Sequence, residues 1–113
     1  MKLKDLLIAE PVIEKLLLEE ISLQSRFKAE YFLQFSKTYT FAFKKVREYA
    51  LEKYEIKEGE TYKLKDKRLE DYINEVGMLS EKEINFEYYP FEINDLKGLD
   101  AFEIASLELF VNE

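Results

Sequence analysis

The chain has 113 residues and a formal net charge of −7, and it contains neither cysteine nor histidine. Without these residues there is no disulfide, no thiolate nucleophile, no cysteine or histidine metal ligand and no imidazole base. With only three glycines, the sequence also lacks a glycine-rich loop that could cradle a phosphate. We therefore predict that the protein is not an enzyme and that it has no catalytic residue, no metal site and no cofactor.

The overall composition is that of a folded, water-exposed domain. Apolar residues make up 47% of the chain and charged residues 36%, which favours a single domain over residues 1–113. Asp5, Glu10 and Pro11 interrupt the apolar N-terminal stretch, so it does not have the pattern of a secretory signal. No apolar run approaches the roughly 18 residues of a membrane span. We expect a cytoplasmic protein with no membrane partner.

Residues 11–54 predict an antiparallel helical hairpin. Pro11 suits the first turn of its first helix, where the missing N–H costs nothing. The residue before a proline avoids the helical region, so residues 3–9 are expected to form a separate short helix or a turn. The apolar residues that follow recur at helical spacing and define the buried side of this helix: Val12, Ile13, Leu16, Leu17 and Ile21.

The second helix of the hairpin is the strongest structural signal in the chain. Residues 22–54 contain no glycine or proline, and they predict one helix of about 30 residues. Ser22 or Ser25 can cap its start. Two threonines and Ser36 lower the helix propensity near its middle, which leaves open a kink or break near residues 36–40.

Aromatic and other apolar side chains recur every three or four residues along this helix, and the stripe is expected to face either the core or a partner protein. The stripe consists of Leu23, Phe27, Tyr31, Phe35, Tyr39, Ala42, Val46 and Tyr49. Other phenylalanines lie beside it, so the helix is apolar on more than one side. Together with two tyrosines further along the chain, they complete the candidate partner interface: Phe27, Tyr31, Phe32, Phe35, Phe41, Phe43, Tyr88 and Tyr89.

Residues 55–113 predict a small α+β part. A turn signal at Gly59 indicates either a short β-hairpin or an extended loop over residues 54–64. Asp66 is expected to cap a third helix over residues 67–79, whose apolar side chains recur at helical spacing.

The stretch EINFEYYPFEI, residues 83–93, alternates polar and apolar side chains and predicts a β-strand with one face against the helices. Pro90 cannot donate to a β-ladder, so this strand should lie at an edge or bend there. Asp100 and Glu103 have the spacing of an N-terminal capping pair and predict a closing helix. That helix is expected to bury Phe102, Ala105 and Leu109 or their neighbours.

These elements define the predicted fold class. It is α+β and predominantly helical. It contains an antiparallel helical hairpin with one long helix, a third helix, a small β element and a C-terminal helix.

The negative charge is concentrated at one end of the sequence. Residues 81–113 hold nine acidic and two basic side chains, whereas residues 1–80 are balanced. The carboxylates that define the candidate acidic surface are Glu81, Glu83, Glu87, Glu92 and Asp95. Such a surface repels nucleic acid, so we predict no direct nucleic-acid binding. It is either a solvated face that keeps the protein soluble or a site that attracts a basic protein, for which it can mimic a nucleic acid.

From about Arg26 onward, the chain resembles a family of small tailed-phage and prophage proteins of unknown function. The resemblance rests on a long helix ending VREYALEKYEIKEGE, a helix in RLEDYINEVGMLSEKEI, and the segment INFEYYPFEINDLKGLDAFEIASLELFVNE. It implies a phage-encoded accessory protein and transfers no catalytic residue.

Two hypotheses of function follow. In the first, the protein acts through protein–protein contacts in virion structure or assembly, with a protein partner or as a homo-oligomer and without a small-molecule substrate. In the second, it is a small acidic inhibitor of a host defence or nucleic-acid-handling complex, and residues 81–113 act as the nucleic-acid mimic.

Overall fold

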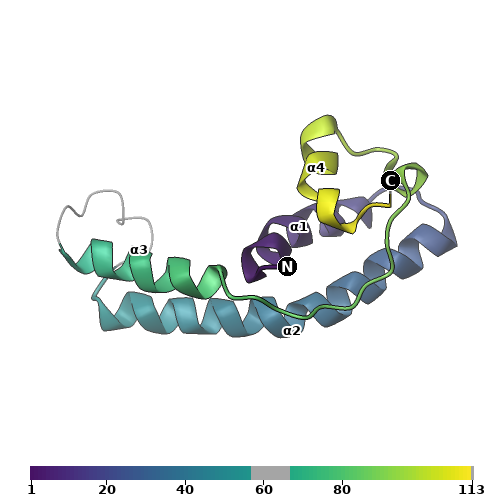
Figure 1. The fold of residues 1–113 in the computed structure, drawn as a ribbon. Coiled ribbons are helices and arrows are strands. Elements are labelled where there is room, and N and C mark those ends of the chain that lie inside the picture. The colour runs from purple at the N-terminus through teal and green to yellow at the C-terminus, as the bar shows by residue number, and fades with distance from the viewer. Residues whose placement is uncertain (57–66, 113) are drawn as a thin grey trace.

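The computed structural model describes residues 1–56 and 67–112, which are predominantly helical (Figure 1). The helices are α1 Leu3–Leu16, α2 Leu23–Lys53, α3 Lys67–Ser80 and α4 Ala101–Ser106. Two short 3₁₀ helices, η2 Ile93–Leu96 and η3 Glu108–Phe110, flank α4. The molecule measures 49 × 26 × 21 Å along its principal axes. It is elongated because α2 runs along its length, with α1 and α4 beside one half of α2 and α3 beside the other.

The long helix and the antiparallel hairpin are both confirmed. α2 has 31 residues, and the Ser22 hydroxyl caps it by accepting a hydrogen bond of 3.1 Å from the Ser25 N–H. The helix passes through residues 36–40 without interruption. α1 runs antiparallel to it, because Glu14 lies 3.5 Å from Lys37 while residues near the end of α1 lie beside the start of α2.

The first helix begins earlier than its proline indicates. α1 starts at Leu3, and Pro11 lies inside it rather than in its first turn, so the prediction of a separate element over residues 3–9 is wrong. The reason is tertiary: Leu3 and Leu6 are buried against the rest of the protein, and their burial outweighs the hydrogen bond that Pro11 cannot donate. The Leu3 N–H also donates to the Lys82 carbonyl at 2.9 Å.

The predicted third helix is confirmed, and it lies at the periphery of the molecule. α3 lies beside the C-terminal half of α2 (Figure 1), and Lys53 Nζ lies 3.4 Å from Glu75 Oε1. None of its residues is fully buried. The hairpin or loop expected around Gly59, and the cap expected from Asp66, lie outside the described residues.

The predicted β element is not confirmed. The segment after α3 is extended and alternates as expected, with Phe86 buried and Asn85 and Glu87 exposed. It forms no β-strand within the described chain, where only two isolated bridges occur, Lys2 with Glu83 and Phe91 with Val111. The segment lies against α2 instead of a second strand, and the Tyr39 hydroxyl donates to the Asn85 carbonyl at 2.9 Å.

The core lies where α1, α2 and the C-terminal segments meet. Its centre is Phe32 of α2, whose ring centroid lies 5.0 Å from that of Phe86 and 4.9 Å from that of Phe110. The remaining large, fully buried apolar side chains come from α1 and from the C-terminal segments: Leu6, Ile13, Leu16, Phe91, Leu96 and Leu107. The extended segment is joined to η3 by the Phe91 N–H, which donates to the Phe110 carbonyl at 2.8 Å.

The C-terminal helix is shorter than predicted and turns a different side to the core. The capping pair is confirmed, because the Glu103 N–H donates to Asp100 Oδ1 at 2.8 Å and the Asp100 N–H donates to Glu103 Oε1 at 2.9 Å. Phe102, Ala105 and Leu109 are exposed, so they are not the buried set. Their neighbours Leu107 and Phe110 are buried, because η3 follows α4 and changes the helical period.

Candidate functional site

Four aromatic side chains of the predicted interface meet on the surface beside α2. We call Phe27, Tyr31, Phe35 and Tyr89 the aromatic patch. Ring centroids lie 4.5 Å apart for Tyr31 and Phe35, 4.8 Å for Tyr31 and Tyr89, and 5.5 Å for Phe27 and Tyr89. Phe27 is 57% exposed, Tyr89 48% and Phe35 42%. The patch therefore keeps a large part of its ring area in water.

The patch is exposed because another side of α2 faces the core. The buried side chains of α2 are mostly small or polar, with Phe32, Leu33 and Phe43 as the large ones: Ser25, Ala29, Phe32, Leu33, Ser36, Thr40, Phe43 and Ala50. The alternative that the aromatic stripe lines the core is therefore wrong for Phe27 and Phe35, whereas Tyr39 is half-buried and packs against the core. The assignment of Phe32 and Phe43 to a partner interface is also wrong, because only 0% and 6% of their surfaces are exposed.

Two further predicted interface residues lie outside the aromatic patch. Phe41 is exposed on another side of α2, where Lys45 Nζ lies 5.3 Å from its ring centroid. Tyr88 is half-buried: its ring centroid lies 5.0 Å from that of Phe110 and its hydroxyl donates to the Leu109 carbonyl at 3.0 Å. Tyr88 thus contributes mainly to packing.

The charged side chains nearest the patch are largely paired. Arg26 lies 3.3 Å from Glu30, and Lys28 lies 2.7 Å from Asp95. A shallow hollow of about 360 Å³ adjoins the patch on the side of Gln34 and Lys37. An aromatic surface with few unpaired charges has the composition of the centre of a protein–protein interface.

Two carboxylates of the predicted acidic surface lie against positive charges of the N-terminal segment. Glu81 accepts hydrogen bonds from Lys2 at 2.5 Å and from Lys4 at 2.6 Å. The hydrogen bond from Lys2, followed by that from Lys4, lowers the pKa of Glu81 to about 2. Glu83 Oε2 lies 3.3 Å from the Met1 amino nitrogen. Both carboxylates hold the chain after α3 against α1.

Asp95 is the most buried of the five carboxylates. It accepts hydrogen bonds from Ser25 Oγ at 2.5 Å, from Lys28 Nζ at 2.7 Å and from the Glu92 N–H at 2.7 Å. Burial alone would raise the pKa of Asp95, but the three hydrogen bonds and the charge of Lys28 outweigh it and lower the pKa. Asp95 therefore ties η2 to the start of α2.

The remaining two carboxylates face water. Glu92 Oε1 accepts a hydrogen bond of 3.0 Å from Asn112 Nδ2. Glu87 is exposed and forms no ion pair with residues 1–56 or 67–112. Because three of the five carboxylates are paired, the acidic surface is weaker than the sequence indicates.

We expect Asp95→Asn to cost about 1–3 kcal/mol of unfolding free energy at neutral pH, because Lys28 would keep a mostly buried ammonium without its counter-charge. The folded pKa of Asp95 lies below its ordinary value of 3.8, so its stabilisation is complete above that pH and disappears as the pH falls through the folded pKa. Denaturant unfolding at several pH values measures the difference between the two proteins, which should shrink only below about pH 4.

The control for Asp95→Asn is Glu87→Gln, which removes the same charge at an exposed position. It should change the unfolding free energy by less than about 0.5 kcal/mol. Equal losses from both substitutions would show that the paired geometry of Asp95 contributes nothing.

A buried polar cluster between α1 and α2 was not found from the sequence. Glu10 is 5% exposed, and its Oε2 accepts hydrogen bonds from Ser36 Oγ at 2.9 Å and Thr40 Oγ1 at 2.8 Å. Lys44 Nζ lies 4.0 Å from the other carboxylate oxygen. The signal that could have revealed it is the spacing of Ser36 and Thr40, which places two hydroxyls one above the other on one side of a helix.

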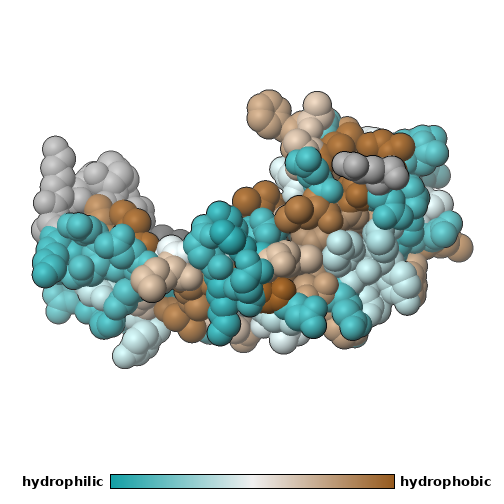
Figure 2. Space-filling model, viewed as in Figure 1, coloured by the Kyte–Doolittle hydropathy of each residue, from teal (hydrophilic) through white to brown (hydrophobic). Residues whose placement is uncertain are grey.

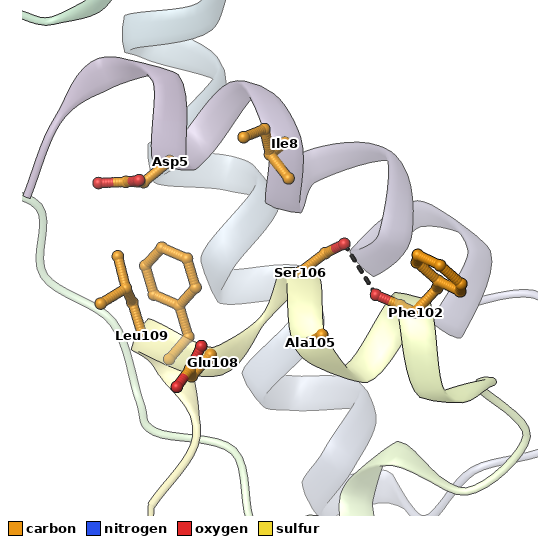
Figure 3. A pocket seen from close by; sticks show the side chains of 8 residues that line it. Asp5, Ile8, Phe102, Ala105, Ser106, Glu108 and Leu109 are labelled. Atoms are coloured by element: carbon orange, nitrogen blue, oxygen red, sulfur yellow. Dashed lines mark hydrogen bonds between the residues drawn. The ribbon is translucent and has the colours of Figure 1, made fainter.

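A second hollow, of about 390 Å³, lies between α1 and the α4–η3 segment (Figure 3). Ile8 and Leu109 contribute apolar walls. Its carboxylates, Asp5 and Glu108, come from different segments and do not point toward one another in Figure 3. The Ser106 hydroxyl is used by a hydrogen bond of 3.0 Å to the Phe102 carbonyl. The hollow is an apolar depression without a convergent acid–base pair.

Figure 2 shows how polarity is distributed on one face of the molecule. Hydrophobic residues gather where α1 and α4 meet, and hydrophilic ones cover much of α3. The surface is hollowed between α3 and the α1–α4 part. In the part of the chain that the structure describes, no helix has the length and apolar character needed to span a bilayer. The same residues include no group of three or more acidic side chains placed to hold a metal ion.

The comparisons with known proteins give no relative. No protein-family model, no curated protein and no solved structure matches this chain.

Proposed function

We propose that this protein is a non-enzymatic accessory protein that acts through protein–protein contacts. The role that we propose lies in virion structure or assembly, within the host cytoplasm or the virion, and its support is the resemblance of the sequence to tailed-phage proteins. The observation that carries the proposal is the aromatic patch, in which contacting rings stay 42–57% exposed at Phe27, Phe35 and Tyr89. Aromatic side chains are enriched at interfaces because a single ring buries a large area with little loss of side-chain entropy.

The rest of the surface supports contact with a protein more than catalysis or small-molecule binding. The hollow between α1 and α4 is shallow, and its polar side chains do not converge. The sequence supplies no cysteine or histidine for nucleophilic or general-base chemistry. A flat patch of aromatic rings beside a long helix has the shape and composition that a protein partner recognises.

The alternative is a small acidic inhibitor that presents residues 81–113 to a basic partner. The pairs of Glu81 with Lys2 and of Asp95 with Lys28 count against it, because their charge is already compensated within the molecule. Glu87 is the carboxylate that best supports the alternative, since it is exposed and lies close to the aromatic patch in sequence.

We expect a photoreactive phenylalanine analogue at position 35 to crosslink to protein when the cells from which the sequence comes are irradiated. The matched control carries the analogue at Phe102, which is 88% exposed on α4 but lies outside the patch. A third variant carries it at Glu87. Gel mobility and mass spectrometry measure the adducts. Position 35 should give adducts of discrete mass, and position 102 should give none.

A variant of the aromatic patch tests whether the crosslink at position 35 depends on the patch. Phe27→Ser combined with Tyr89→Ser should reduce the adduct at position 35 by about 30-fold, which corresponds to the ~2 kcal/mol of an interface hot spot. Adducts from position 87 alone would favour the acidic inhibitor. Absence of any adduct from position 35 would contradict the proposed function.

A further inference from the structure

The aromatic patch is one end of a longer exposed stripe on α2. We call this set the outer stripe: Phe27, Tyr31, Phe35, Thr38, Ala42, Val46 and Tyr49. Its residues are separated by steps of four, four and three, and this order then repeats. Such an eleven-residue repeat has about 3.67 residues per turn, so the stripe runs almost parallel to the helix axis. At 1.5 Å per residue it extends over roughly 33 Å.

The stripe is exposed although it borders other parts of the chain. Thr38, Ala42 and Val46 line a hollow together with Leu79 of α3 and with Lys82 and Ile84 of the segment that follows it. Its large side chains are exposed at both ends of the stripe, with exposed fractions of 57% for Phe27, 50% for Val46 and 67% for Tyr49. Thr38 and Ala42, between them, are exposed as well. A regular apolar stripe that stays exposed along a helix is the pattern of a helix–helix contact with another chain.

We propose that the outer stripe is a dimer interface whose occupant is a second copy of this chain. The two α2 helices pack antiparallel, with the two-fold axis close to Thr38. This proposal rests on the proposed function, because it names the partner of the aromatic patch. Its geometry is isologous, so the same surface of each copy contacts the other.

Self-complementarity of the stripe identifies the second copy as the partner. The N-terminal half carries bulky rings, whereas the C-terminal half carries Ala42 and Val46 before it ends in Tyr49. Antiparallel pairing about Thr38 places Phe35 opposite Ala42 and Tyr31 opposite Val46. Large side chains then meet small ones in the four central contacts, which is how two packed helices fill the space between them. At each end of the interface, Phe27 meets Tyr49 of the other copy. A parallel pair would place ring against ring and small residue against small residue.

The exposed area is that of a small dimer interface. Phe27, Phe35, Tyr49 and Tyr89 are each about half exposed, so each contributes on the order of 100 Å². With Tyr31 and Val46, the stripe and Tyr89 present roughly 500 Å² of mostly apolar surface, in the upper part of the ~300–600 Å² typical of the largest patch on a monomer. Two copies would bury about 1,000 Å² in total, the smallest area expected of a specific interface. Polar side chains beside the stripe, such as Gln34 and Lys45, extend the face toward the ~800 Å² per partner of a stable complex.

The absence of cysteine allows a direct test by single-cysteine crosslinking. Thr38→Cys places one thiol at the proposed two-fold axis, so purified protein should form a disulfide-linked dimer under mild oxidation. Lys37→Cys is the matched control, because residue 37 is the exposed neighbour on α2 but points about 100° away from the stripe. We expect the Thr38→Cys dimer to form at least about tenfold faster. Equal rates would overturn the antiparallel arrangement.

A second variant tests the interface without a disulfide. Ala42→Arg leaves the core untouched, since Ala42 is exposed in the single chain, but it sets a charge against Phe35 of the second copy. Light scattering over a concentration series should show a dimer for the unaltered protein and at least about 30-fold weaker dimerisation for Ala42→Arg. Circular dichroism should show the same helix content for both. An unaltered protein that stays monomeric at all concentrations would overturn the proposal.

The mass of the position-35 photo-adduct separates the two proposals. An adduct of twice the chain mass supports the second copy. An adduct with a different protein, together with a monomer in light scattering, overturns the second copy and leaves the proposed function standing. No adduct at all overturns both.

Discussion

Phe32→Ala should lower the free energy of unfolding by about 3–5 kcal/mol. The Phe32 ring is fully buried, and it contacts the rings of Phe86, Phe91 and Phe110 at centroid distances of 5.0, 6.2 and 4.9 Å. These rings come from the extended segment and from η3, so a cavity at position 32 weakens the apolar packing that holds the C-terminal part on α2. Urea unfolding followed by circular dichroism measures the loss.

Phe102→Ala is the control for this prediction, because it removes the same ring from an 88% exposed position. It should change the free energy of unfolding by less than about 0.5 kcal/mol. If Phe32→Ala were as mild as the control, the core would not be centred on α2.

Glu10→Ala should lower the free energy of unfolding by roughly 2–4 kcal/mol, and it is the second large effect that we expect. The substitution leaves the hydroxyls of Ser36 and Thr40 without their acceptor in a site where Ser36 is 0% and Thr40 2% exposed. It also leaves a cavity between α1 and α2. The same urea unfolding experiment measures the change.

Replacing the whole polar cluster should behave differently from removing one member. The triple variant Glu10→Leu, Ser36→Ala, Thr40→Val fills the site with apolar groups and leaves no unpaired polar atom, so its stability should return to within about 1 kcal/mol of the original protein. Glu14→Ala, one turn further along α1, removes an exposed carboxylate 3.5 Å from Lys37 and should cost less than about 1 kcal/mol. A triple variant as unstable as Glu10→Ala would refute this account of the cluster.

Local signals predicted the helices well because they act within a few residues. The absence of glycine and proline predicts α2, Ser22 caps it, and Asp100 with Glu103 marks the start of α4. Pro11 led to a wrong prediction of where α1 begins, because the start of this helix depends on distant contacts. Its preference for a first turn is local, whereas the burial of Leu6 depends on contacts that distant parts of the chain supply.

The orientation of α2 could not be predicted, because two of its sides have a helical apolar period. The more hydrophobic one, with Phe27 and Phe35, is exposed, and the one with Ala29, Ser36 and Thr40 is buried. Small residues allow α1 to approach closely, and a polar residue is acceptable in a core when a partner such as Glu10 satisfies it. A single sequence does not show which side its own chain covers and which side is left for another molecule.

The lack of tertiary information in a single sequence also explains why the strand predicted over residues 83–93 is not confirmed. Alternation over residues 83–93 predicts an extended backbone with one side buried, and the structure has this arrangement around Phe86. Alternation does not say whether the neighbour is a strand or a helix.

For the candidate site, four of the eight predicted interface residues meet in the aromatic patch, and three of the five predicted acidic residues form ion pairs inside the molecule. Ion pairing depends on tertiary contacts, and a count of charged residues in the sequence does not show which of them meet.

The buried carboxylate of α1 also determines the alignment of the hairpin. Apolar side chains alone would let α1 slide along α2, since one leucine or phenylalanine contact can replace another. If α1 moved by one turn in either direction, about 5.4 Å, the Glu10 carboxylate would face Phe32 or Phe43 and lose a hydroxyl partner. Only the observed register gives the Glu10 carboxylate both of its hydroxyl partners. Glu10 thus gives the two helices a unique alignment, and with it a fixed position for every side chain on the exposed face of α2.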